Sequence, residues 1–254
     1  MRSLLTTALA AALGVVLAGA AQAAEGQWGT VKGQVTWGGK APPAPEKIDV
    51  TKDAEHCLEK GPLLKEEFVV GKNGGVKNVF VWLQDVNNPK AKLPIHPSLK
   101  EVKDKEVVID QPCCKFEPHA IALREGQKLI GKNSAPIPHN MHWLGGDDNP
   151  GDNKLIPAGG KIEIDLNPST KPIAITCDIH RWMKAWVRVF NHPYFAVTDA
   201  DGKFEIKNAP AGKYNIVMWQ EGVGWVNGGK AGKAIEIAAG KTVEVNEKLM
   251  PEEK

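Results

Sequence analysis

The sequence from Ile173 to Phe190 reads IAITCDIHRWMKAWVRVF, and it contains both a structural and a chemical pattern. Two β-rich segments, 173–176 and 186–190, flank a short polar loop, which is typical of a strand, a loop and a returning strand. The loop carries Cys177, His180 and Met183 at offsets of zero, three and six. A strand–loop–strand unit can direct a thiol, an imidazole and a thioether toward one point.

A thiolate, two imidazoles and a weak axial thioether form the ligand set of a blue-copper site. The loop lacks the second imidazole, which must come from another strand. Pro138-His139-Asn140 supplies a candidate upstream of the loop, and His142 competes with it. Successive strand side chains alternate between faces, so only one of His139 and His142 faces the site, and the Pro-His-Asn context favours His139.

The remainder of the chain predicts an all-β protein. Short β-branched segments end repeatedly at Gly, Pro, Asn or Asp, which favours a sandwich architecture; they lie at 31–37, 76–83, 162–166, 204–206, 214–219 and 242–245. The stretch from Asp53 to Glu66 is the one place where we expect a helical turn or two. Gly61-Pro62 argues against a longer helix there.

Composition and the N-terminal segment limit the classes of function. The 254 residues carry 32 Lys+Arg and 30 Asp+Glu, a net charge of +2, which argues against nucleic-acid binding. Residues 1–23 have the pattern of a signal peptide, with a short basic start, an apolar run and Ala21-Gln22-Ala23 as a cleavage site. We therefore expect a soluble periplasmic or otherwise exported protein, with no membrane insertion after signal removal.

Three cysteines remain once Cys177 is assigned to the metal. An odd number in an exported protein indicates one disulfide and one spare thiol. Adjacent cysteines seldom bond to each other, so Cys57 is expected to pair with Cys113 or Cys114. Cys114 is preferred because it lies in the strand that leads into the metal-binding part of the chain, but the sequence does not separate the two.

The remaining histidines are given no metal role. His119 lies in the same β segment as Ile121 and Leu123, so we expect it to be a packed structural residue. Histidines 56, 96 and 192 lie beside loop signals, and we expect them to face solvent.

Residues 105–190 resemble the cupredoxins, the Greek-key β-sandwich family of blue copper proteins. The resemblance is carried by Lys115-Phe116-Glu117-Pro118, Ile121–Gln127, Asn133, Pro138-His139-Asn140 and the short ligand loop, whose spacing is similar to that of amicyanin. It implies one type-1 copper bound by His139, Cys177 and His180, with Met183 axial.

The resemblance also implies a function. A closed ligand set favours single-electron transfer to an exported redox partner over catalysis, because catalytic metal sites keep an open position. The family places the second loop histidine, here His180, at the exposed edge of the metal, so electrons are expected to pass there. Trp182 could form part of a docking patch or pack over Met183.

The segments 27–104 and 193–250 resemble a second, small β-sandwich, the carboxypeptidase regulatory-like (transthyretin-like) module. Asp201-Gly202, Phe204, Pro210-Ala211-Gly212 and Tyr214 carry this resemblance. The copper domain is then inserted between the two halves of a discontinuous module. This organisation leaves a second functional class open, namely copper storage, delivery or sensing, with the extra module binding a partner.

Overall fold

The computed structural model describes residues 27–146, 148–226 and 228–251. The predicted signal peptide, residues 1–23, lies outside these ranges. In the described ranges no helix is long and apolar enough to cross a bilayer.

The described chain is built almost entirely from β-strands, as the sequence predicts, with one short helix and two 3-10 turns. In chain order the elements are β1 (Trp28–Trp37), α1 (Ala54–Cys57), β2 (Phe80–Asp85), η1 (Pro97–Leu99), β3 (Glu106–Asp110), β4 (Ala120–Arg124), β5 (Lys128–Lys132), β6 (His139–Trp143), β7 (Asp152–Ile156), β8 (Lys161–Ile164), β9 (Ile173–Thr176), β10 (Lys184–Phe190), β11 (Phe195–Val197), β12 (Lys203–Pro210), β13 (Gly212–Gln220), β14 (Gly224–Val226), η2 (Gly229–Ala231), β15 (Lys233–Ile237), β16 (Thr242–Glu244) and β17 (Glu247–Leu249).

Strands β3 to β10 form one sandwich, called here the first sandwich. Its larger sheet has the order β4-β10-β9-β6-β7 and its smaller sheet the order β3-β5-β8. Apolar side chains from both sheets, such as Leu129, Ile156 and Val187, meet in one core. Burying that apolar surface is the main driving force for this packing.

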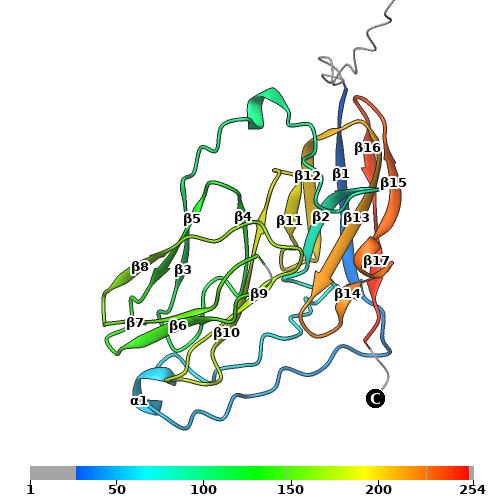
Figure 1. The fold of residues 1–254 in the computed structure, drawn as a ribbon. Helices are drawn as coiled ribbons and strands as arrows, with labels where there is room; N and C mark the ends of the chain where they lie inside the picture. The colour runs from blue at the N-terminus through cyan, green and yellow to red at the C-terminus, as the bar shows by residue number, and fades with distance from the viewer. Residues whose placement is uncertain (1–26, 147, 227, 252–254) are drawn as a thin grey trace, which may run out of the picture.

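The second sandwich combines β1 and β2 with β11 to β17. Strand β1 pairs with β12, β16 and β17, and β2 lies between β11 and β13 in the facing sheet. The first strands of the chain therefore complete sheets formed by its last strands (Figure 1). The domain bounds, 105–190 for the copper domain and 27–104 with 193–250 for one discontinuous module, stay a prediction, which limited proteolysis would test.

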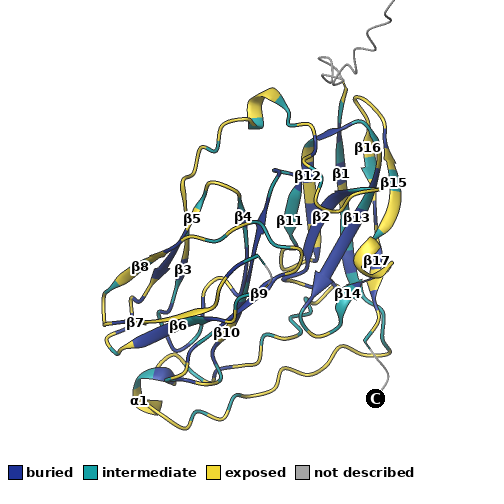
Figure 2. Cartoon of the chain, viewed as in Figure 1, coloured by how far each residue is buried: buried dark blue, intermediate teal, exposed yellow. Residues whose placement is uncertain are grey.

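A third cluster of buried side chains joins the two sandwiches. Phe80 and Trp82 of β2, Trp219 of β13 and Phe190 of β10 pack together there. The outer face of the larger sheet of the first sandwich is thereby covered by the second (Figure 2).

Residues 38–79 connect two strands of the second sandwich, β1 and β2, by way of the first sandwich. After β1 the chain runs to α1, beneath the end of the first sandwich where β6, β7 and β10 lie, and then returns to β2 (Figure 1). Most of this segment is exposed, but Cys57 at the end of α1 is fully buried (Figure 2). The disulfide between Cys57 and Cys114 fastens α1 to the first sandwich.

Candidate metal centre

The loop between β9 and β10 is closed by its own backbone. The Met183 amide donates to the His180 carbonyl at 2.9 Å, and the Cys177 amide donates to the Met183 carbonyl at 3.4 Å. The His180 amide also donates to the Cys177 sulfur at 3.4 Å. These bonds fold the seven residues back on themselves, which brings the Cys177 and His180 side chains to the same place.

Strand β6 brings His139 to this loop, and Asn140 fixes the register. β6 pairs with β9 through His142 and Thr176, so His139 lies beside the loop that follows β9. The Asn140 side-chain oxygen accepts hydrogen bonds from the amides of Asp178, at 2.8 Å, and Ile179, at 3.2 Å. One buried amide side chain thus ties the ligand loop to the strand that carries His139.

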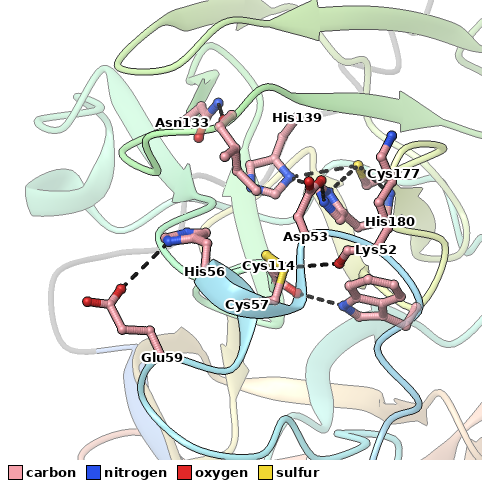
Figure 3. The surroundings of a disulfide bond; sticks show 12 residues. Lys52, Asp53, His56, Cys57, Glu59, Cys114, Asn133, His139, Cys177 and His180 are labelled. Carbon is pink, nitrogen blue, oxygen red and sulfur yellow. Dashed lines mark hydrogen bonds and ion pairs between the residues drawn. A yellow bond between two sulfur atoms is a disulfide. The ribbon is translucent and has the colours of Figure 1, made fainter.

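The three donor atoms form a small triangle inside the protein (Figure 3). The Nδ1 atoms of His139 and His180 are 3.0 Å apart, and each lies 4.0 Å from the Cys177 sulfur. The circle through these three atoms has a radius of about 2.2 Å, and nitrogen and thiolate ligands lie at about 2.0–2.3 Å from a bound metal such as zinc. The residues therefore fit a single metal ion.

Burial keeps both imidazoles in the form that binds metals. His139 and His180 are completely inaccessible to solvent, and Cys177 and Met183 are 1% exposed. Burial, with the neighbouring His180, lowers the pKa of His139 to about 4. Burial also lowers the pKa of His180, although the Asp53 carboxylate opposes this change. Neutral imidazoles at pH 7 can donate lone pairs without first losing a proton.

Asp53 contacts the ligand set from outside the first sandwich. Its carboxylate oxygen lies 2.9 Å from Nε2 of His180, on the side of the ring away from the donor triangle (Figure 3). A carboxylate on the second nitrogen of a ligand histidine fixes the tautomer and the orientation of the ring. The contact leaves Nδ1 of His180 to face His139 and Cys177.

The disulfide lies directly beside this contact. The sulfur atoms of Cys57 and Cys114 are within 4.8 Å of a ring nitrogen of His180. The pairing of Cys57 with Cys114 rather than Cys113 confirms the preferred alternative from the sequence, and Cys113 is a buried free thiol.

The expectation that His180 lies at an exposed edge is wrong. The family resemblance concerns residues 105–190, and the covering side chain, Asp53, comes from outside that range, on the segment that carries α1. Among the predicted ligands, Met183 lines a cavity of about 510 Å³, whose wall also includes Trp182, His119 and Glu221. Trp182 is half-buried, and its ring nitrogen donates to the Cys114 carbonyl at 3.0 Å.

Two other histidines near the ligand strands have identifiable partners. His142 points away from the donor triangle and pairs with Asp178 at 3.0 Å, as strand alternation predicts. His119 is buried, as expected, but its ring is held by the Glu221 carboxylate, with Glu66 at 3.7 Å, rather than by apolar packing alone.

The histidines expected in solvent do not behave alike. His192 is 5% exposed, so that prediction is wrong: the ring is enclosed where the two sandwiches meet, and it stacks near Tyr194. The side chain of His56 is only 16% exposed because it belongs to α1, beside the metal centre. His96 is partly exposed, and its Nδ1 accepts the amide of Ser98.

Sequence reasoning did not find Asp53 as a partner of His180. An aspartate directly before a helix is normally interpreted as an N-cap, whose carboxylate accepts a hydrogen bond from the first turn. Asp53 makes no such bond and adopts a left-handed backbone conformation with φ of 50°. That geometry leaves the carboxylate free to reach His180, a contact for which the local sequence gives no signal.

The comparisons with known proteins cover only parts of the chain. A family model described as polysaccharide lyase family 4, domain II, matches residues 170–245. This differs from the carboxypeptidase regulatory-like resemblance, which depended on an Asp-Gly hairpin turn and other turn residues that many β-modules share. The matched range begins just before β9, inside the first sandwich, and no curated protein matches the chain.

Solved structures resemble about a third of the chain. A structure of an oxidised amicyanin mutant is 21% identical, covers 35% of this chain and 86% of its own, and has a TM-score of 0.31. A purple cupredoxin from Nitrosopumilus maritimus is 16% identical, covers 33% of this chain and 98% of its own, and has a TM-score of 0.28. With coordinate similarity this low, the case for a metal depends on the residues themselves.

Proposed function

We propose that this chain is an exported type-1 copper protein that carries single electrons between redox partners, with His139, Cys177 and His180 as ligands and Met183 as the weak axial ligand. The observation that carries the proposal is the buried triangle of two Nδ1 atoms and one sulfur. The circle through these atoms has a radius that matches a metal–ligand distance. Soft thiolate and imidazole donors of this kind suit copper.

The chain contributes rigidity and enclosure to this site. Asn140 and the loop backbone hold Cys177 and His180 in place before any metal binds, and the His180 amide donates to the sulfur. A copper ion in such a set would change oxidation state by one electron. Because the ligands are fixed and buried, little rearrangement would accompany that change, which favours electron transfer over substrate chemistry.

Addition of Cu(II) to the purified protein tests the ligand assignment. Wild type is expected to develop the intense blue thiolate-to-copper absorption at one copper per chain, and Cys177→Ser is expected to lack it. Cys113→Ser is the matched control, because Cys113 is also a buried free thiol. A blue band that survives in Cys177→Ser, or disappears in Cys113→Ser, contradicts the assignment.

A redox titration separates electron transfer from copper storage, delivery or sensing. An electron carrier is expected to cycle reversibly between Cu(II) and Cu(I) without losing the metal. A site that holds only Cu(I), or that releases copper readily to a competing chelator, contradicts the electron-transfer proposal and favours the delivery class.

The route for electrons is proposed to lie on the Met183 side of the site, because Asp53 covers His180. Trp182 and Met183 line the same cavity there. Trp182→Leu is expected to slow electron self-exchange while leaving the blue absorption in place. Substitution of exposed Lys213 by Met is the control, and an equal slowing in both variants contradicts this route.

A further inference from the structure

Arg188 lies between the two sandwiches, away from the candidate metal centre. Side chains alternate along β10, so Val187 and Val189 enter the core of the first sandwich while Arg188 faces the second. Its side chain is only 7% exposed. The guanidinium carbon lies 3.7 Å from the ring centre of Trp82 and 4.3 Å from that of Phe190.

The positive charge of Arg188 has no ion-pair partner among the described residues. Within the described residues, its guanidinium makes one hydrogen bond, from Nε to the Ser169 carbonyl at 3.1 Å. Nη1 is buried, and no described atom accepts its hydrogen bonds. Burial lowers the pKa of Arg188 to about 9, which reflects how unfavourable the charge is in this place. A buried charge without a partner is strongly destabilising.

The aromatic rings do not remove this problem. A ring attracts a cation through its negatively charged face. The N–H groups of a guanidinium lie in its own plane, and each still needs an acceptor oxygen. Trp82 and Phe190 therefore hold the Arg188 side chain in position while leaving the buried Nη1 without an acceptor.

Arg188 lines a cavity of about 230 Å³, which also touches Trp82, Ser169 and Thr170. Lys90 and Lys92 also line the cavity. Each lies near one carboxylate, but beyond a short ion-pair contact: Asp148 is 3.5 Å from Lys90 and Glu125 is 3.6 Å from Lys92.

His192 also lines this cavity, but it adds no positive charge at pH 7. Burial and the charge of Arg188 lower its pKa to about 4, so it is neutral at pH 7. The cations of the cavity wall thus outnumber its carboxylates by one, and the surplus charge is the buried guanidinium.

We propose that this cavity binds a small oxyanion, the carboxylate of an organic acid or a phosphate, with Arg188 as its central contact. The planar guanidinium matches the paired oxygens of either group, and such charge-assisted bonds are among the strongest polar contacts in proteins. Because β2, β10 and the connecting loops all contribute to the cavity, the bound anion would contact both sandwiches.

Calorimetric titration of the purified protein with phosphate and, separately, with succinate in low-chloride buffer tests the proposal. Wild type is expected to bind at least one of the two anions, and the relative affinities distinguish an inorganic from an organic ligand. Arg188→Met is expected to weaken binding by about tenfold or more, because it removes the charge and the donors. Arg188→Lys keeps the positive charge but loses the paired donors of the guanidinium. Its affinity for the anion should therefore fall between those of wild type and Arg188→Met. Lys213→Met is the control for losing one surface charge.

Thermal unfolding separates a binding role from a structural one. Without added anion, Arg188→Met should be at least as stable as wild type, because it removes an uncompensated buried charge. The better-binding anion should raise the melting temperature of wild type and not that of Arg188→Met. The proposal is overturned if wild type binds neither anion, if Arg188→Met binds equally well, or if Arg188→Met is markedly less stable without anion. Cys177→Ser should bind the anion normally, which keeps this result independent of the copper proposal.

Discussion

The buried hydroxyl of Thr198 in the second sandwich finds both of its partners in the chain itself, whereas the buried histidines of the candidate metal centre in the first sandwich face one another. The Thr198 hydroxyl donates to the Val76 carbonyl at 2.7 Å and accepts the Val79 amide at 2.9 Å. By contrast, Nδ1 of His139 faces Nδ1 of His180, and Nε2 of His139 is buried with no described partner. Because unsatisfied polar groups are costly to bury, this arrangement is what the proposed copper site would require of its ligands before the metal binds.

Metal binding should produce the largest effect, and it should act on the first sandwich. Copper at about a thousand times its dissociation constant is expected to stabilise the folded protein by about 4 kcal/mol, because the unfolded chain lacks the preformed triangle. Scanning calorimetry with and without copper measures this shift. The gain should disappear in Cys177→Ser and on addition of a chelator. Equal stabilisation of Cys177→Ser would show that copper acts elsewhere on the molecule.

Loss of the disulfide should come next. Cys57 and Cys114 are 57 residues apart, and removing such a cross-link commonly costs about 2–4 kcal/mol. We expect the double variant Cys57→Ala, Cys114→Ala to melt at a lower temperature and to expose His180 to solvent, because α1 loses its attachment. Cys113→Ala, at the neighbouring free thiol, is the control. Hydrogen exchange of residues 50–60 should accelerate only in the double variant.

The convergence of Cys177 and His180 was predictable because its information is local. Cys177, His180 and Met183 lie within seven residues, between two recognisable strands, and the alternation of β6 side chains separates His139 from His142. The all-β class follows equally well from short β-branched segments and turn residues.

What sequence could not supply are contacts between distant segments. Asp53 is 127 residues from His180, and its role depends on where the segment 38–79 crosses the first sandwich. His192 follows a loop signal, yet it is buried because the second sandwich packs over it. Local sequence patterns predict the strands of each sandwich, but they do not predict which side chains are buried where the two sandwiches meet.

Asp53 belongs to the segment 38–79, which leaves the second sandwich and crosses the first. Its removal should have a moderate effect on the affinity for copper. Asp53→Asn keeps the shape but loses the charge beside His180, so we expect a roughly tenfold to hundredfold weaker affinity for copper, the range typical of partners of ligand residues. Competition with a chelator of known affinity measures it. Glu55→Gln removes a neighbouring charge on α1 as a control. Equal losses in the two variants would assign the effect to general electrostatics rather than to the His180 contact.

Glu221 tests the contact between the sandwiches, and its substitution should have the smallest effect. Burial alone would raise the pKa of this carboxyl, but hydrogen bonds from His119 and Trp186 and the charge of Lys184 outweigh it and hold the pKa at about 2. The folded pKa of Glu221 is below the ordinary value of 4.5, so its contribution to stability is complete above that pH and is lost as the pH falls toward 2.

Glu221→Gln retains the shape and part of the hydrogen bonding, so about 1 kcal/mol should be lost at pH 7. The wild-type advantage should shrink as the pH falls from about 5 to 2, which urea unfolding at several pH values measures. Glu163→Gln, which removes an exposed carboxylate of β8, is the control and should show little loss. A Glu221→Gln deficit that stays constant down to pH 2 would mean that the charge of Glu221 does not hold the two sandwiches together.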